Sequence, residues 1–270
     1  MTTFQKIIKY LAIALALFLV IGILEAVLGM IGIVGSLFDK DAVTEDLKSY
    51  EVSSEIDRLE IEIGAADFKI VRGTVLSVES NLSKLTVKEQ NGTLIIRQQT
   101  NRGITEQEAS LTLCIPEEKI FDRIELVTGA GRLTVEQLST ETLMLELGAG
   151  EVYIHELNAS RSADIAGGAG QITVNGGVLH NLDLEMGLGE LNLTAMLTGE
   201  SELELGIGQS NIMVLGDRKD YRLDLEKGLG ELTVNGISIS NTENYGNGQH
   251  KLSIHGGIGA IHVDFVQSAD

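Results

Sequence analysis

The chain has 270 residues, of which 43% are hydrophobic and 4% aromatic, and its 39 acidic and 20 basic residues give a formal net charge of −19. This charge excludes nucleic acid as a partner, because nucleic-acid binding depends on basic side chains that neutralise phosphates. Anionic lipid head groups and wall polymers are repelled as well, so a protein or envelope component with a cationic surface is the favoured partner. The single cysteine, Cys114, excludes an intramolecular disulfide.

An apolar segment lies near the N-terminus, where residues 7–38 are interrupted only by Lys9 and Glu25. About 20 apolar residues suffice for a helix that crosses a membrane, so residues 1–38 are predicted to form a single transmembrane anchor. A cleaved signal peptide is the alternative, but the segment is longer than the usual apolar region of a signal peptide. Lysines flank both ends equally, and the free amino terminus favours a cytoplasmic N-terminus with the remaining chain outside the cell membrane.

Two further segments separate this anchor from the regular part of the sequence. Residues 39–56 are polar with scattered charge, and they are predicted to be a juxtamembrane linker. Residues 57–115 contain strand patterns of uneven spacing, a degenerate corner at Gly64-Ala65-Ala66 and a hairpin signal at Asn91-Gly92. We expect this irregular β section to cap one end of a repeat array, as terminal units of repeat proteins do.

A Gly-x-Gly pair then recurs through residues 116–270, with steps of 19, 20, 19, 19, 22 and 29 residues between first glycines. In the unit LDLEMGLGELNL, apolar and polar residues alternate, the alternation slips at Gly189-Glu190, and it then resumes. Such alternation predicts a strand with one buried face, and glycine permits a corner at the slip. The sequence therefore predicts an all-β fold, a parallel β-helix or β-solenoid with coils of about 19–20 residues, preceded by one transmembrane α-helix. The predicted structural corners are Gly129, Gly131, Gly148, Gly150, Gly168, Gly170, Gly187, Gly189, Gly206, Gly208, Gly228, Gly230, Gly257 and Gly259.

From about Arg58 to Phe265 the chain resembles the putative-adhesin family of bacterial cell-envelope proteins, a domain family of unknown function. The resemblance rests on the Ile115-Pro116 step, the segment FDRIELVTGAGRLTVEQL, the successive Gly-x-Gly corners and the ending GGIGAIHVDF. It implies a β-solenoid that follows an N-terminal membrane helix, a location in the cell envelope and no catalytic site. The GAG, GLG and GIG corners depart from the more polar corners usual in the family, which weakens the case for a ligand site there.

Alignment of the repeats on their first glycine places glutamates at equivalent positions. The first set, two residues before the glycine, is Glu146, Glu185, Glu204 and Glu226, and the second set, after the second glycine, is Glu151, Glu190 and Glu231. Stacked coils lie about 4.8 Å apart, so each set is expected to form a ladder of like charges. Such a ladder either faces water or holds a hard cation such as calcium. The period is about twice that of the calcium-binding nonapeptide repeat, so a solvated acidic face is favoured and no metal site is assigned.

The sequence contains no signal of an enzyme. G-x-S-x-G, H-E-x-x-H and phosphate-loop motifs are absent, and the five histidines lack the spacing of metal ligands. The Gly-x-Gly elements precede strands, whereas a dinucleotide-binding glycine motif precedes a helix. We therefore expect no catalytic residues and no cofactor.

Together these observations predict a non-enzymatic, membrane-anchored β-solenoid that displays an acidic surface for cell-envelope interaction, adhesion or stress sensing. One alternative is a self-associating scaffold, in which copies join through the membrane helix or through exposed strands at the solenoid ends. A cation-binding module is a second alternative.

Overall fold

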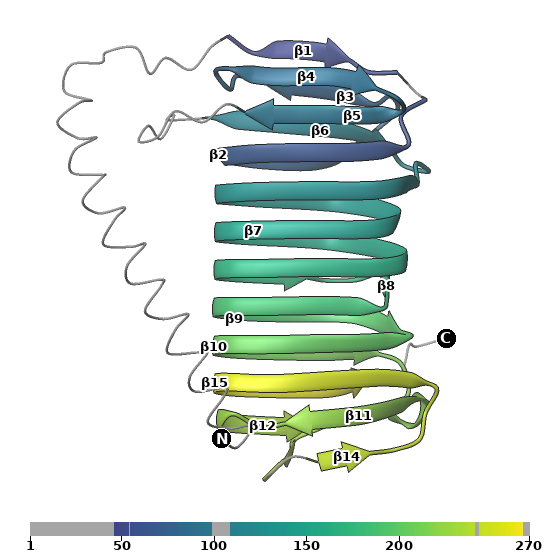
Figure 1. The fold of residues 1–270 in the computed structure, drawn as a ribbon, viewed down its shortest axis with the longest axis vertical. Coiled ribbons are helices and arrows are strands. Elements are labelled where there is room, and N and C mark those ends of the chain that lie inside the picture. Colours follow the sequence, from purple (N-terminus) through teal and green to yellow (C-terminus); the bar gives the residue numbers. More distant parts are fainter. Residues whose placement is uncertain (1–45, 54, 99–108, 241–242, 267–270) are drawn as a thin grey trace, which may run out of the picture. The chain divides into compact units, whose positions relative to one another are not determined.

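A computed structural model describes residues 46–53, 55–98, 109–240 and 243–266. These residues form a β-solenoid in which all fifteen strands belong to one sheet (Figure 1), so the predicted all-β solenoid is confirmed for this part of the chain. The predicted anchor at residues 1–38 lies outside the described residues. Within them, no helix has the length and apolar character needed to cross a bilayer.

The elements follow the chain from Lys48 to Val266. They are β1 (Lys48–Glu51), β2 (Arg58–Gly73), β3 (Ser77–Ser80), β4 (Leu85–Gln90), β5 (Thr93–Gln98), β6 (Ser110–Pro116), β7 (Phe121–Val174), β8 (Val178–His180), β9 (Leu182–Thr198), β10 (Glu200–Leu215), the 3₁₀ turn η1 (Arg218–Asp220), β11 (Tyr221–Glu226), β12 (Leu229–Val234), β13 (Ile237–Ser238), β14 (Glu243–Tyr245) and β15 (His250–Val266).

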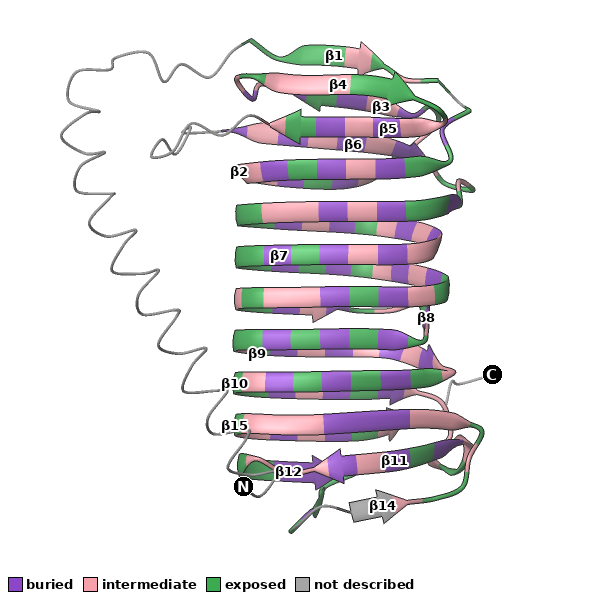
Figure 2. Cartoon of the chain, in the orientation of Figure 1, coloured by how far each residue is buried: buried purple, intermediate pink, exposed green. Residues whose placement is uncertain are grey.

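Successive coils pair in parallel, with equivalent repeat positions opposite each other. In the β9–β10 pair, Glu204 lies opposite Glu185 and Gly208 lies opposite Gly189. The 54-residue β7 continues this winding without a break (Figure 1). Buried and exposed residues alternate along each coil (Figure 2), and the inward aliphatic side chains form one continuous core. Burial of each such side chain contributes about 1.5–3 kcal/mol to stability. The conformation that buries every second residue is therefore strongly favoured, and for this reason the alternation in the sequence predicted the fold.

The two glycines of each corner are required for different reasons. Gly150 has a φ of +138°, a backbone conformation that side chains disfavour. Gly148 has no such φ, but a Cβ at this position would overlap the carbonyl oxygen of Gly129 in the neighbouring coil. The corner backbones of adjacent coils therefore approach more closely than any side chain would allow.

The order of the coils in the stack differs from their order in the chain. The last coil, β15, pairs in parallel with β10 on one side and with β11 and β12 on the other. The first coil, β2, likewise lies between β7 and the β5 and β6 strands. Both ends of the stack therefore consist of antiparallel pairs, β1–β3 and β4–β5 at one end and β12–β13 and β11–β14 at the other. Of the section 57–115, which was expected to be irregular, β2 forms a coil in register with β7.

Candidate interaction surface

The first predicted glutamate set does not form a continuous row. Glu185 and Glu204 are direct neighbours on adjacent coils. Ala166 lies opposite Glu185 and separates it from the coil that carries Glu146, while His255 lies between Glu204 and Glu226. The alignment therefore identified equivalent positions correctly, but the expected ladder of like charges is interrupted twice.

His255 bridges the coils on both sides of β15. Its Nε2 atom lies 3.3 Å from a carboxylate oxygen of Glu202, and its Nδ1 atom lies 3.3 Å from one of Glu226. A protonated imidazole has two N–H donors and can serve both carboxylates, whereas the neutral ring has one. The inserted coil thus places a partner for carboxylates between Glu204 and Glu226, which were expected to be neighbours in the ladder.

The glutamates of the second predicted set are also separated from one another by other residues. Glu151 forms an ion pair of 3.1 Å with Arg132, Glu190 lies between glutamines of the adjacent coils, and Glu231 lies opposite Ala260. Across the described ranges, no group of three or more His, Cys, Asp or Glu side chains is arranged to hold a metal ion.

A more concentrated acidic surface lies four residues before the first glycine. Asp164, Asp183 and Glu202 are exposed and directly opposite one another on three successive coils. With Glu185 and Glu204 they make up five exposed carboxylates, which we call the acidic face. No lysine or arginine of the described residues forms an ion pair with any of the five. The repeat alignment contains this signal, because the position four residues before the first glycine is acidic in several units.

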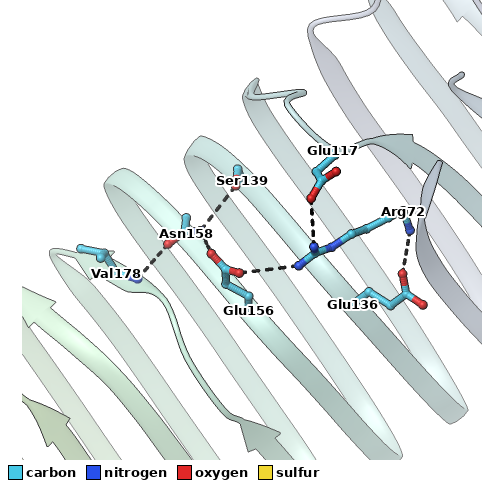
Figure 3. Close-up of polar contacts among 7 residues, drawn as sticks. All are labelled: Arg72, Glu117, Glu136, Ser139, Glu156, Asn158 and Val178. Carbon is cyan, nitrogen blue, oxygen red and sulfur yellow. Dashed lines mark hydrogen bonds and ion pairs between the residues drawn. The ribbon is translucent and has the colours of Figure 1, made fainter. Parts of the chain in front are cut away.

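Some acidic residues elsewhere on the solenoid are compensated by arginine. The Arg72 guanidinium lies 3.1 Å from a carboxylate oxygen of Glu117 and 3.8 Å from one of Glu156, and its backbone N–H donates to Glu136 at 2.8 Å (Figure 3). Asn158 extends this network, since its side chain donates to Glu156 and accepts from the backbone of Val178. Arg72 thus neutralises part of the negative charge in this region, whereas no lysine or arginine of the described residues does so on the acidic face.

Beside the acidic face, large aliphatic side chains occupy the middle position of four consecutive corners. Leu188, Ile207, Ile258 and Leu229 lie opposite one another in that order, with exposed fractions of 37, 42, 41 and 66%. We call this row the corner ridge. In the preceding coils the same position is alanine, with Ala169 opposite Leu188 and Ala65 opposite Ala130. The ridge is therefore confined to one half of the stack.

Fold and surface together define a β-solenoid repeat protein with a local acidic surface, whose carboxylates form no ion pair with a lysine or arginine of the described residues. The Toastrack DUF4097 family profile matches residues 53–261, and the chain belongs to this family. This match confirms the resemblance found in the sequence.

Several solved structures are similar to the chain. A putative cell adhesion protein from Clostridium sporogenes is 15% identical over 82% of this chain and 99% of its own, with a TM-score of 0.42. A putative adhesin from Bacteroides fragilis is 15% identical over 80% of this chain and 95% of its own, with a TM-score of 0.46. A putative lipid binding protein from Parabacteroides distasonis is 14% identical over 82% and 96%, with a TM-score of 0.40. Likeness at this level carries no information about function. Among curated proteins, none matches this chain significantly.

Proposed function

We propose that the protein is a non-enzymatic, membrane-anchored β-solenoid whose acidic face binds a protein with a cationic surface in the cell envelope. The observation that carries this proposal is the acidic face itself, in which five exposed carboxylates on three coils have no lysine or arginine partner among the described residues. Carboxylates at this spacing repel one another, and a cationic partner relieves that repulsion on binding. The apolar segment 7–38 supports the anchoring part of the proposal.

The acidic face is tested by neutralising it at constant shape. The variant Asp183→Asn/Glu185→Gln/Glu202→Gln/Glu204→Gln is compared with wild type for binding of a lysine-rich peptide at low and physiological salt. We expect wild type to bind, with an affinity that falls as salt rises, and the variant to lose most of this binding.

A matched control separates the face from net charge. The variant Glu79→Gln/Glu118→Gln/Asp122→Asn/Asp264→Asn makes the same change in charge at exposed positions elsewhere. It is expected to bind nearly as well as wild type. Equal loss of binding in the two variants would show that overall charge, and not this face, attracts the peptide.

A further inference from the structure

We propose that the corner ridge is the docking site for an amphipathic helical segment with basic flanks, carried by a partner protein. This inference rests on the proposed function, because the acidic surface supplies the attraction for the basic residues, and it adds where the partner's apolar side chains would lie. The uniform GLG and GIG corners weakened the case for a ligand site when only their sequence was considered. In the solenoid, however, the central residues of these corners are exposed and aligned on adjacent coils, and this arrangement favours a binding site.

The ridge differs from the scattered apolar residues of an ordinary protein surface. Single exposed aliphatic residues are common and need no explanation. Met213, for example, is 42% exposed, but its register neighbours are Thr194 and Asp264. Ile207, by contrast, has Leu188 on one side and Ile258 on the other. The four ridge side chains therefore present one continuous apolar strip to solvent.

Glycines leave this strip open to a partner on both sides. Each ridge residue stands between the two glycines of its corner, as Ile207 does between Gly206 and Gly208. No side chain from these positions can cover the aliphatic groups, so a partner can approach along the whole row. Beyond the glycines, carboxylates lie on both sides of the ridge. One side carries Glu185, Glu204 and Glu226 with His255 among them, and the other carries Glu190 and Glu231, which are separated by Gln209 and Ala260.

The dimensions of the ridge match an α-helix. Three coil steps of about 4.8 Å give a strip about 14 Å long, which corresponds to about 10 residues of helix. The apolar stripe of an amphipathic helix places a side chain about every 5.4 Å turn, close to the spacing of the coils. Basic residues on the flanks of that stripe would face the carboxylates on the two sides of the ridge, which are more numerous on the side of Glu185 and Glu204. A helix of this kind would satisfy both the apolar and the charged features of the surface.

A second copy of the chain fits the ridge less well. Two copies paired through this edge would bring their carboxylates together, and like charges at close distance are unfavourable. A row one residue wide is also small beside the about 800 Å² per partner that a stable protein interface buries. Charge and size therefore favour a short cationic segment as the occupant.

The test uses the full-length protein in nanodiscs of zwitterionic lipid, with empty nanodiscs as the blank. The probe is a helical peptide of about 14 residues that carries leucines on one face and lysines on the rest. Its control has the same composition in an order that forms no apolar face. We expect the amphipathic peptide to bind at least tenfold more tightly than the control, and Ile207→Gln/Ile258→Gln to remove this difference. Leu229→Gln, at the most exposed ridge position, should reduce it, while Met213→Gln should leave it unchanged.

The outcomes distinguish this inference from the proposed function. If both peptides bind equally and Ile207→Gln/Ile258→Gln has no effect, the ridge is not the docking site, while binding through the acidic face stands. If neither peptide binds even at low salt, the proposed function fails together with the inference. A photo-crosslinker at position 229 identifies other occupants. Crosslinking to a second copy or to residues 7–38, in preference to the peptide, would overturn the assignment of a partner helix.

Discussion

Ile258 of β15 lies directly opposite Ile207 of β10, although β11 and β12 come between these strands in the chain. The insertion of β15 places Ile258 in the corner ridge and His255 between Glu204 and Glu226. The corner ridge and the His255 bridge thus depend on the pairing of segments that are distant in sequence, whereas the acidic face lies on coils that stack in chain order.

Gly208→Ala should destabilise the solenoid strongly. Gly208 has a φ of +147°, and an added Cβ would overlap the backbone carbonyl of Gly189. We expect a loss of about 2–4 kcal/mol in the free energy of unfolding, measured by urea denaturation. Gly236→Ala is the control, because Gly236 also has a positive φ, +71°, but nothing lies within 4 Å of the added Cβ. Its cost should be about 1–2 kcal/mol. Equal losses in the two variants would show that the positive φ alone, and not the close approach of the adjacent coil, accounts for the cost of Gly208→Ala.

Stability should decline at alkaline pH because of Tyr221. Burial raises the pKa of this tyrosine above its ordinary value of 10.0, since it disfavours the phenolate. As pH rises, the unfolded state therefore loses this proton before the folded state does. The contribution of Tyr221 to the free energy of unfolding is fully present below about pH 10 and is lost as pH rises through the pKa of the folded state. Tyr221→Phe should flatten this decline in urea unfolding between pH 8 and 11. Tyr153→Phe, at an exposed position, should not. A decline of the same size in all three proteins would contradict the assignment.

Calcium should not raise the melting temperature. A ligand that binds only the native state stabilises it by RT ln(1 + L/Kd), where L is the concentration of free ligand. The first glutamate set is interrupted by Ala166 and His255, so no tight calcium site is expected there. Differential scanning calorimetry with millimolar calcium, compared with sodium at equal ionic strength, measures this. A calcium-specific increase of several degrees would revive the cation-binding alternative.

A fragment that spans residues 46–270 should remain monomeric in light scattering. Short strands form the ends of the stack, and β1, with the sequence KSYE, covers the edge of β3 with charged residues. Charged, short edge strands discourage strand addition. The fragment 57–270 lacks β1, so its β3 edge is free and it should self-associate more readily. Concentration-dependent oligomers of both fragments would favour the scaffold alternative.

The proposed orientation predicts that the C-terminus is accessible from outside intact cells. Ser268→Cys in a Cys114→Ser background should react with a membrane-impermeant thiol reagent added to cells, because the solenoid is proposed to lie beyond the membrane. The Cys114→Ser protein alone is the blank. Labelling that appears only after lysis would require the opposite topology.

Much of the fold could be predicted from local pattern. Alternation in units such as LDLEMGLGELNL specifies which side chains are buried, and the paired glycines specify the corners, because both depend on residues within one coil. The acidic positions were equally visible once the repeats were aligned. Their separation by Ala166 was readable in the same alignment, since that unit carries alanine where others carry glutamate.

The order of the coils was not readable in this way. Every coil presents the same pattern of inward aliphatics and corner glycines, so β10 could pair with either β12 or β15 without changing its buried face. Local pattern specifies how one coil closes. Which coil stacks on which depends on competition between distant segments whose strand edges are similar. The sequence thus established a glycine-cornered, acidic β-solenoid. The packing of β15 between β10 and β12 established which side chains meet on its surface, because only the assembled stack places Ile258 and His255 beside residues of both neighbouring coils.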